Sequence, residues 1–411
     1  MQSGIGILVL IGFCWLLSER RSEMPWRMIA IGLSVQIVMA LAMLKLSWIA
    51  QLLSGLNEIV YAIEAATRAG GTFIFGFLGG GEPPFDVTDG SAMFLFAFRV
   101  LPQIVVFTVL VAIFWHWRIL PVIVKSIGWL LQKSLGVGGA IGTAGAASLF
   151  LGAIETPTVI RAYLAKLTRS EFYTLMTLGM STVAGSVMVL YTQVLSGVAD
   201  DIIGHIISAS LINMIGAIYV ARALIPETET ITQASDHSSL SFASTIDALL
   251  QGTQTGVTLA LNVGAMLLVL ISLTALANQL LGWVDFADMP LSIERIFGWI
   301  FAPVAWLIGI PWAEAQTAGS LLGIKLVLNE LIAYIQLAEL ADGLSSDTRL
   351  VLIFALCGFA NFGSVGILLG GLSVLIPERR AEFLRLAPRS LISGTIVTLI
   401  TGAIVSLVLL I

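Results

Sequence analysis

Residues 301–334 read FAPVAWLIGIPWAEAQTAGSLLGIKLVLNELIAY, an apolar stretch that is interrupted by Gly309, Pro311 and Glu314. A membrane-spanning helix needs about 20 consecutive apolar residues, and a proline inside a helix removes a hydrogen bond and bends the chain. The apolar character nevertheless extends over residues 297–345. We therefore expect this segment to enter the membrane, turn near Pro311 and return to the side from which it came.

A second segment of this kind lies at residues 136–168, with its expected turn at GAIETP (152–157). Two broken elements that enter from opposite faces indicate an inverted repeat, in which secondary transporters hold their solute near the membrane midplane. Irregular backbone at that depth is stable only when it is buried in protein or lines a watery cavity. The sequence therefore predicts a cavity between two hairpins.

The whole chain is apolar. Of its 411 residues, 58% are hydrophobic and 11% are charged, whereas soluble domains carry roughly 25% charged residues. Eight further stretches are candidates for spanning helices: 1–18, 27–45, 96–117, 172–195, 202–224, 257–282, 349–372 and 390–411. We therefore expect an all-α membrane protein, with eight transmembrane helices plus two opposed re-entrant helical hairpins in an inverted repeat.

The basic residues orient the chain, because Lys and Arg accumulate in cytoplasmic loops. Of the 20 basic residues, 14 fall in the loop segments 19–27, 118–171, 222–256 and 373–389. The alternate loops are acidic, with Asp86, Asp200, Asp201 and Asp285 among their residues. We therefore expect an inner-membrane protein with both termini in the periplasm. Basic residues follow residues 1–18, the reverse of the order in a signal peptide, so this stretch is expected to stay as a span.

This topology divides the chain into five expected parts. Residues 1–117 hold the N-terminal scaffold helices, including an interfacial helix at 47–68 whose apolar face is interrupted by charges. The remaining parts are a first half of the transport core, 118–225, with the hairpin 136–168 and a broken helix 172–195; a polar cytoplasmic linker, 226–256; a second half, 257–375, with the hairpin 297–345 and a broken helix 349–372; and a C-terminal helix, 376–411.

Ionisable residues inside membrane segments are costly and mark functional sites by default. Glu155 lies at the first expected turn and Glu330 lies in the second hairpin. The alternative is that each carboxylate simply pairs with Lys325 or with an arginine. Asn361, in the middle of the last broken helix, is a further candidate for solute contact. The small residues around it are better explained by close packing of helices.

Other function classes find little support in the sequence. The three histidines and two cysteines form no metal-binding spacing, and no catalytic constellation falls at one membrane depth. The net charge of −5 leaves no basic face for nucleic acid. We therefore expect no enzyme, no cofactor and no nucleic-acid partner. A channel or an intramembrane enzyme is a remote alternative, because a channel would line its pore with continuous polar stripes.

Four segments resemble the concentrative nucleoside transporter family in its bacterial eight-span form. They are RILPVIVKSIGWLL (118–131), MSTVAGSV (180–187), PWAEAQTAGSLLGIKLVLNELIAY (311–334) and ALCGFANFGSVGILLGGL (355–372). The third is specific, because PW, an acidic residue, GSLLG, K and the NE pair recur in the second hairpin of the family. The resemblance implies an ion-coupled symporter that imports nucleosides by alternating access. It also implies a homotrimer in which a scaffold surrounds a transport domain.

Carried over position by position, the resemblance assigns the solute contacts. Glu330, Asn361 and Ser364 match residues that bind the ribose hydroxyls. Phe359 and Val187 match residues that line the base. The substrate is expected to lie between the two hairpins.

The first-hairpin motif departs from the family, which has Gly-Gln-Ser/Thr-Glu where this chain has Gly152, Ala153, Ile154 and Glu155. The two lost polar groups address the nucleobase in the family. A site without such groups discriminates poorly between related ligands. Base preference is therefore expected to be broad, purine-leaning or shifted to a different ribosyl or polyol solute.

The coupling ion follows from a second departure. Sodium-coupled members carry an Asn seven residues before the hairpin glutamate, where this chain has Ser148. A serine there resembles the proton-coupled bacterial branch, so we expect H⁺ coupling with Glu155 or Glu330 as the proton carrier. Na⁺ is the alternative, bound near Ser148, Ser181 and Thr182 together with hairpin carbonyls.

Overall fold

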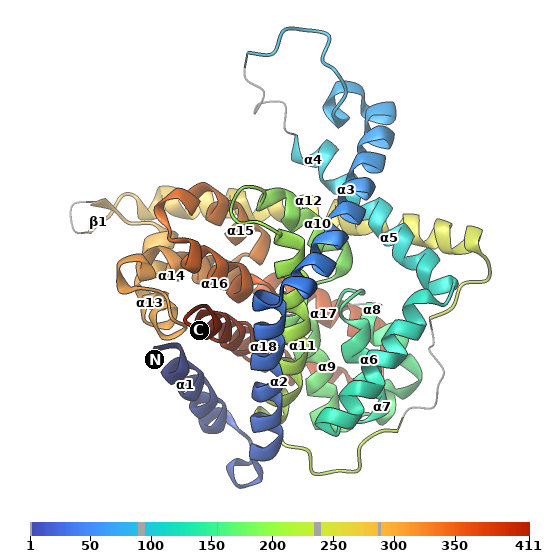
Figure 1. The fold of residues 1–411 in the computed structure, drawn as a ribbon, viewed down its shortest axis with the longest axis vertical. Helices are drawn as coiled ribbons and strands as arrows, with labels where there is room; N and C mark the ends of the chain where they lie inside the picture. Colours follow the sequence, from blue (N-terminus) through green and yellow to red (C-terminus); the bar gives the residue numbers. More distant parts are fainter. Residues whose placement is uncertain (1, 89–94, 154, 234–239, 287–288) are drawn as a thin grey trace.

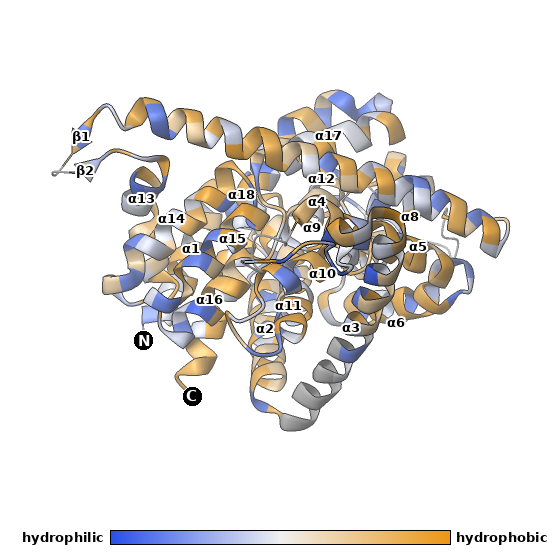
Figure 2. Cartoon of the chain, turned by 90° about the horizontal axis from the view of Figure 1, so that it is seen from above, coloured by the Kyte–Doolittle hydropathy of each residue, from blue (hydrophilic) through white to orange (hydrophobic). Residues whose placement is uncertain are grey.

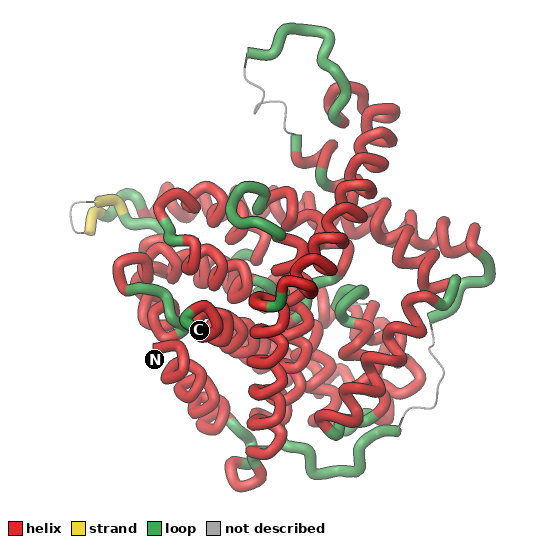
Figure 3. The backbone as a smooth tube through the Cα atoms, viewed as in Figure 1, coloured by secondary structure: helices red, strands yellow, loops and turns green. Residues whose placement is uncertain are grey.

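The computed structural model describes residues 2–88, 95–153, 155–233, 240–286 and 289–411, which form a helical body with one projecting arm (Figure 1). The arm contains the C-terminal part of α3 (Ser47–Phe75) and the loop after it. Nearly all regular structure is helical (Figure 3). In these described ranges the only strands are β1 (Asp285–Phe286) and β2 (Met289–Pro290), which pair antiparallel.

The N-terminal region packs on the body rather than forming a layer of its own. Its elements are α1 (Gln2–Leu17), η1 (Arg21–Glu23), α2 (Trp26–Lys45), α3, η2 (Gly76–Gly79) and α4 (Phe96–Arg99). Both α1 and α2 contact α11 and α18, whereas α3 contacts α5 and α11. The expected interfacial segment 47–68 is part of the longer α3. That helix ends at Gly76, whose φ of 61° favours glycine.

The next region begins with a long apolar helix and ends with another. It contains α5 (Leu101–His116), α6 (Ile119–Leu135), α7 (Gly139–Ala147), α8 (Glu155–Val159), η4 (Arg161–Lys166), α9 (Arg169–Ser181), α10 (Gly185–Val194) and α11 (Ile202–Leu224). A Cβ placed on Gly142 of α7 would lie 2.7 Å from the Gly128 carbonyl oxygen of α6. Small residues therefore allow these two helices to approach closely.

The last region repeats this order of elements. It contains α12 (Thr245–Leu281), α13 (Ile293–Leu307), α14 (Trp312–Val327), α15 (Glu330–Leu340), η5 (Ala341–Gly343), α16 (Ser346–Leu356), α17 (Phe362–Leu375), η6 (Pro377–Arg379) and α18 (Arg380–Leu409). α12 packs against α5, and α13 packs on α14 as α6 packs on α7. α16 and α17 are interrupted as α9 and α10 are. The chain is thus built from two halves with the same element order, α5–α11 and α12–α18.

The helices of residues 297–345 are broken at two places rather than one. α13 and α14 meet at 116° across the break before Trp312, close to the expected turn. A second break at Leu328 and Asn329 separates α14 from α15. This second break, at which Asn329 starts a new helix, was not expected from the sequence; the re-entrant hairpin itself stays a prediction. The Asn329 side-chain oxygen accepts from the Ile332 N–H at 2.9 Å, which is an N-cap.

The described residues contain six helical segments that are long and apolar enough to cross a membrane: Trp26–Lys45, Phe96–His116, Arg169–Val194, Ile202–Leu224, Thr245–Leu281 and Pro377–Leu409. The α13–α14 pair and the shorter apolar helices α1 and α17 are further candidates. Figure 2 shows that much of α12 consists of hydrophobic residues, and several of them, such as Leu261 and Leu268, are exposed. The chain is therefore a helical membrane protein. α12 begins inside the expected linker 226–256, because Ser244 caps it by accepting from the Asp247 N–H.

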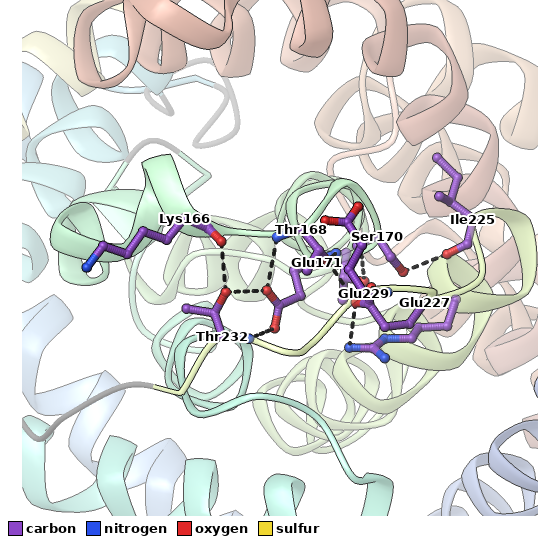
Figure 4. Close-up of polar contacts among 10 residues, drawn as sticks. Lys166, Thr168, Ser170, Glu171, Ile225, Glu227, Glu229 and Thr232 are labelled. Atoms are coloured by element: carbon purple, nitrogen blue, oxygen red, sulfur yellow. Dashed lines mark hydrogen bonds and ion pairs between the residues drawn. The ribbon is translucent and has the colours of Figure 1, made fainter.

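The chain after α11 is fixed to the start of α9 (Figure 4). Thr168 and Glu171 form a capping box, in which each side chain accepts from the backbone N–H of the other. Glu171 is fully buried and also accepts from the N–H and the hydroxyl of Thr232, at 2.9 and 2.6 Å. The Thr168 hydroxyl donates to Glu227 at 2.8 Å. The buried carboxylate of Glu171 therefore joins the start of α9 to the segment that follows α11.

Candidate functional site

Glu330 lies at the first position of α15 and is 5% exposed. The Tyr191 hydroxyl donates to its Oε1 at 2.6 Å, and the Asn361 amide donates to its Oε2 at 2.9 Å. Each carboxylate oxygen thus has a donor. The ion pairs found between described residues include none with Glu330. Pairing with Lys325, the alternative considered from the sequence, is not what holds this carboxylate.

Asn361 connects Glu330 to the start of α17. Its side-chain oxygen accepts from the Ser364 N–H at 2.7 Å, which makes it the N-cap of α17. Its amide nitrogen points the other way, to Glu330. Asn361 is 2% exposed, whereas Ser364 and Phe359 are half-buried beside it. Two helix N-termini therefore converge here, and both favour a negative charge.

The helix before Asn361 ends early because its last carbonyls have donors from other elements. The final carbonyls of any helix lack donors within the helix. Here the three pairs are the Tyr334 hydroxyl with the Ile353 carbonyl at 2.7 Å, the Lys325 ammonium with the Ala355 carbonyl at 2.9 Å, and the Asn213 amide with the Cys357 carbonyl at 2.6 Å. Gly358 follows with a φ of 153°, and a Cβ there would lie 2.7 Å from the Ser181 carbonyl oxygen. The two interrupted helices are thus in contact at their breaks.

The break between α9 and α10 is held by the first half in a similar way. The Val183 N–H donates to the Ser210 hydroxyl of α11 at 3.2 Å. The Gly185 N–H donates to the Phe150 carbonyl at 3.3 Å. This second bond joins the break to the turn that precedes Glu155. The predicted site residues at the first turn and at the start of α10 are therefore neighbours across this hydrogen bond.

The three hydroxyls expected near a coupling ion are all buried. Ser148 donates to the Gly145 carbonyl, Ser181 to the Thr177 carbonyl and Thr182 to the Leu178 carbonyl, each at 2.8 Å. Each hydroxyl proton is thus directed back into its own helix. The oxygen lone pairs remain available as acceptors or ligands.

Glu155 starts α8 and is half-buried. Its carboxylate lies against Gly152, where a Cβ would come within 2.4 Å of Oε2, and the backbone N–H groups of Gly152 and of Glu155 itself donate to it. The carboxyl borders a cavity of about 120 Å³ that Trp115, Phe242 and Gln251 also line. Glu330 does not line this cavity. One pocket bearing both carboxylates therefore stays a prediction.

The residues expected beside a base lie on α10 and at the first turn. Ala153 packs on Gly179 of α9: a Cβ added to Gly179 would lie 3.3 Å from the Cβ of Ala153. Ile154 falls outside the described residues. Val187 lies in the first turn of α10 and is buried. Tyr191, the partner of Glu330, was not predicted from the sequence. It follows Val187 by four residues and so shares its helix face, which is the signal that could have found it.

Three family models match the chain along its length. They are "Na+ dependent nucleoside transporter N-terminus" over residues 5–78, "Nucleoside recognition" over 97–197 and "Na+ dependent nucleoside transporter C-terminus" over 205–406. Nucleoside permease NupC of Helicobacter pylori is 34% identical over 412 residues, which cover 98% of this chain and 97% of the permease. Transporter YutK of Bacillus subtilis is 37% identical over 406 residues, which cover 97% of each chain.

Solved structures are similar over the same extent. CNTnw in an inward-facing substrate-bound state has a TM-score of 0.91 to this chain at 36% identity, with 99% of this chain and 98% of CNTnw covered. Substituted variants of CNTnw have also been solved in intermediate and outward-facing states, and these match with TM-scores of 0.91 and 0.90.

Proposed function

Because the chain belongs to the bacterial concentrative nucleoside transporter family, we propose that it imports nucleosides by ion-coupled symport. Members of this family are transporters and not enzymes. The observation that carries the proposal is the 2.9 Å hydrogen bond between Asn361 and Glu330 where two helix N-termini converge. A buried carboxylate next to a carboxamide offers acceptors and a donor to a vicinal diol. Hydrogen bonds from hydroxyls to the ionised group are charge-assisted and strong.

In this proposal, the ribose hydroxyls bind to Glu330, Asn361 and Ser364. A hydroxyl of the substrate replaces the Tyr191 hydroxyl as a donor to Glu330. The base lies along Phe359 and Val187, and residues 152–155 approach it from the first half. Since Ala153 and Ile154 carry no polar side-chain group, the base contributes few hydrogen bonds. A different ribosyl or polyol solute on the same fold is the alternative.

The proposed topology has eight spans and two opposed re-entrant hairpins in the inner membrane, with both termini in the periplasm. The repeated element order of α5–α11 and α12–α18 supports an inverted repeat. A homotrimer is proposed from the family resemblance. Alternating access is supported by the inward-facing, intermediate and outward-facing states known for CNTnw.

Protons are the proposed coupling ion, with Glu155 as the carrier. Both oxygens of Glu330 already accept hydrogen bonds from side chains, so this residue is suited to remain an ionised anchor. Glu155 has no such pair of side-chain donors among the described contacts and borders a cavity of about 120 Å³, which gives a proton access to its carboxyl. Na⁺ is the alternative, in keeping with the family description, and it would bind at Ser148, Ser181 and Thr182.

The test is uptake of labelled uridine by proteoliposomes that contain the purified chain. We expect saturable uptake that concentrates uridine inside the vesicles, continues when choline replaces sodium at fixed pH, and stops when a protonophore removes the pH gradient. Loss of uptake in choline would establish the sodium alternative. Uptake that never exceeds the external concentration would indicate a channel. Competition by a panel of nucleosides, free bases and polyols would separate nucleosides from the alternative solutes.

The proton carrier is tested with Glu155→Gln. This variant should no longer concentrate uridine in response to a pH gradient, while exchange of internal for external uridine continues, because exchange needs no net proton movement. Concentrative uptake at the wild-type level would exclude Glu155 as the carrier. Glu314→Gln is the control, since Glu314 contacts Ser345 at the surface and lies outside the proposed site.

A further inference from the structure

Lys325 is an ammonium buried in the second half that the proposed mechanism does not use. It lies on α14 and is 2% exposed. Its Nζ donates to the Ala355 carbonyl at 2.9 Å and to the Thr398 hydroxyl at 2.7 Å. The ion pairs between described residues include none with Lys325. Because a buried charge is costly unless it is compensated, the groups around this ammonium must supply the compensation.

The compensation comes from the C-terminal end of α16 and from the negative charge of Glu330, which also acts on the ammonium. Ala355 is in the last turn of that helix, where unpaired carbonyls and the helix dipole favour a cation. A cavity of about 10 Å³ beside Lys325 is lined by Ala355, Ala360 and Thr398. That volume holds about one water molecule at most. The ammonium is therefore fixed in place, and no free ion shares its position.

Lys325 also joins the two segments that form the candidate site. Toward the C-terminus of its own helix, the chain reaches the Asn329 cap and then Glu330. The carbonyl that the Lys325 ammonium binds belongs to Ala355 of α16. That helix ends at the next residue, and the chain then reaches Asn361, the cap of α17. Glu330 and Asn361 meet at 2.9 Å. A donor that ties α14 to the end of α16 therefore sets the spacing between these two side chains.

The first half has no such fixed cation at the corresponding helix end, among the residues that the structure describes. Near the end of α9, backbone carbonyls accept hydrogen bonds from the hydroxyls of Ser181 and Thr182, which belong to the same helix and its cap. Beyond the helix, the Val183 N–H donates to the Ser210 hydroxyl. These described contacts are all uncharged. The two halves thus end their interrupted helices differently, one with a resident ammonium and one with hydroxyls alone.

We propose that Lys325 is a positioning residue for ribose recognition: its ammonium clamps the end of α16 to α14 and so holds Asn361 against Glu330. The inference rests on the proposed function, because it concerns the same site. A positioning role and a purely structural role for Lys325 predict different results for sugar selectivity. Loss of the clamp changes which sugars are accepted, whereas loss of a merely structural contact lowers the amount of folded protein and leaves selectivity intact.

The experiment compares uptake of uridine with uptake of 2′,3′-dideoxyuridine, each normalised to reconstituted protein. Wild type should prefer uridine by on the order of 100-fold, since the site is built to bind hydroxyls. Lys325→Met should reduce this ratio by about tenfold or more, because uridine uptake falls while dideoxyuridine uptake changes little. Lys133→Met is the matched control. Lys133 is exposed on α6 over the Trp129 ring, and its loss should leave the ratio unchanged.

A folded Lys325→Met protein that keeps the wild-type ratio would overturn the proposal. If that variant does not fold, Thr398→Val decides, because it removes one partner of the ammonium and leaves the charge in place. We expect Thr398→Val to reduce the ratio by about threefold, and an unchanged ratio would again overturn the proposal. Wild-type vesicles that take up no nucleoside would instead refute the proposed function, a failure visible before any variant is compared.

Discussion

Replacing Glu330 by Gln removes one acceptor oxygen and the charge while keeping the shape of the side chain. In the structure, Oε1 receives the Tyr191 hydroxyl and Oε2 receives the Asn361 amide. The Asn361 oxygen is occupied by the Ser364 N–H, so Asn361 can offer only its amino group. The oxygen of the introduced glutamine must then face Asn361, and its amino group must face Tyr191. A donor thus takes the place of an acceptor where a ribose hydroxyl would bind.

The size of the effect follows from the number of bonds lost. A hydrogen bond to a charged group contributes about 1.5–3 kcal/mol, against roughly 1 kcal/mol for a neutral pair. Two ribose hydroxyls that each lose about 1 to 1.5 kcal/mol give a total of about 2 to 3 kcal/mol. At about 1.4 kcal/mol per factor of ten, the concentration for half-maximal uptake rises roughly 30- to 150-fold.

The assay is uptake of labelled uridine by proteoliposomes over a range of uridine concentrations, with Glu314→Gln as the control. Glu314 accepts from the N–H and hydroxyl of Ser345 at 3.3 and 3.0 Å and lies outside the proposed site. The control should stay within about twofold of wild type, as expected for a surface contact. A Glu330→Gln protein whose half-saturation lies within about threefold of wild type would refute the ribose assignment.

Three further predictions concern the base, the carboxylate of Glu19 and the segment after α11. Ala153→Gln combined with a hydroxyl at the next position should narrow the base preference in nucleoside competition assays, and an unchanged profile would contradict the role given to this turn. Partial burial opposes ionisation of Glu19, but hydrogen bonds and charges from Arg169 and Arg389 outweigh it and hold the pKa of Glu19 below its ordinary value. The stability from this group is therefore present above the unfolded pKa and lost as pH falls through the folded pKa, so Glu19→Gln should flatten the acid side of a melting profile recorded from about pH 3 to 7. Glu171→Ala should destabilise the fold by about 1–3 kcal/mol, because buried donors lose their acceptor; an unaltered melting temperature would show that Glu171 does not hold that segment.

Hydropathy located most of the apolar helices, because that signal depends only on local composition. The bend before Trp312 was also accessible, since Gly309 and Pro311 interrupt the helix wherever it lies. The break at Asn329 could not be predicted from the sequence. An asparagine between apolar residues reads equally well as a packing residue or as a cap, and its capping role depends on where α15 goes next.

The residues at and around the candidate site also divide into those that the sequence could indicate and those that it could not. Asn361 was accessible as a polar residue in an apolar helix, and the resemblance assigned it to the ribose. Tyr191 was missed because it lies 139 residues from Glu330 in sequence, and only the packing of the two halves brings them together. Asn213 was missed for the same reason, since its partner is a backbone carbonyl of the other half.

One helix, α11, supports both interruptions: Ser210 accepts from Val183 in one half, and Asn213 donates to Cys357 in the other. The two interruptions are therefore linked through one common helix. In a symporter this allows ion occupancy and solute occupancy to reinforce each other without direct contact between the two ligands. Thermodynamic linkage then requires the reinforcement to be mutual: the factor by which the ion tightens nucleoside binding equals the factor by which the nucleoside tightens ion binding.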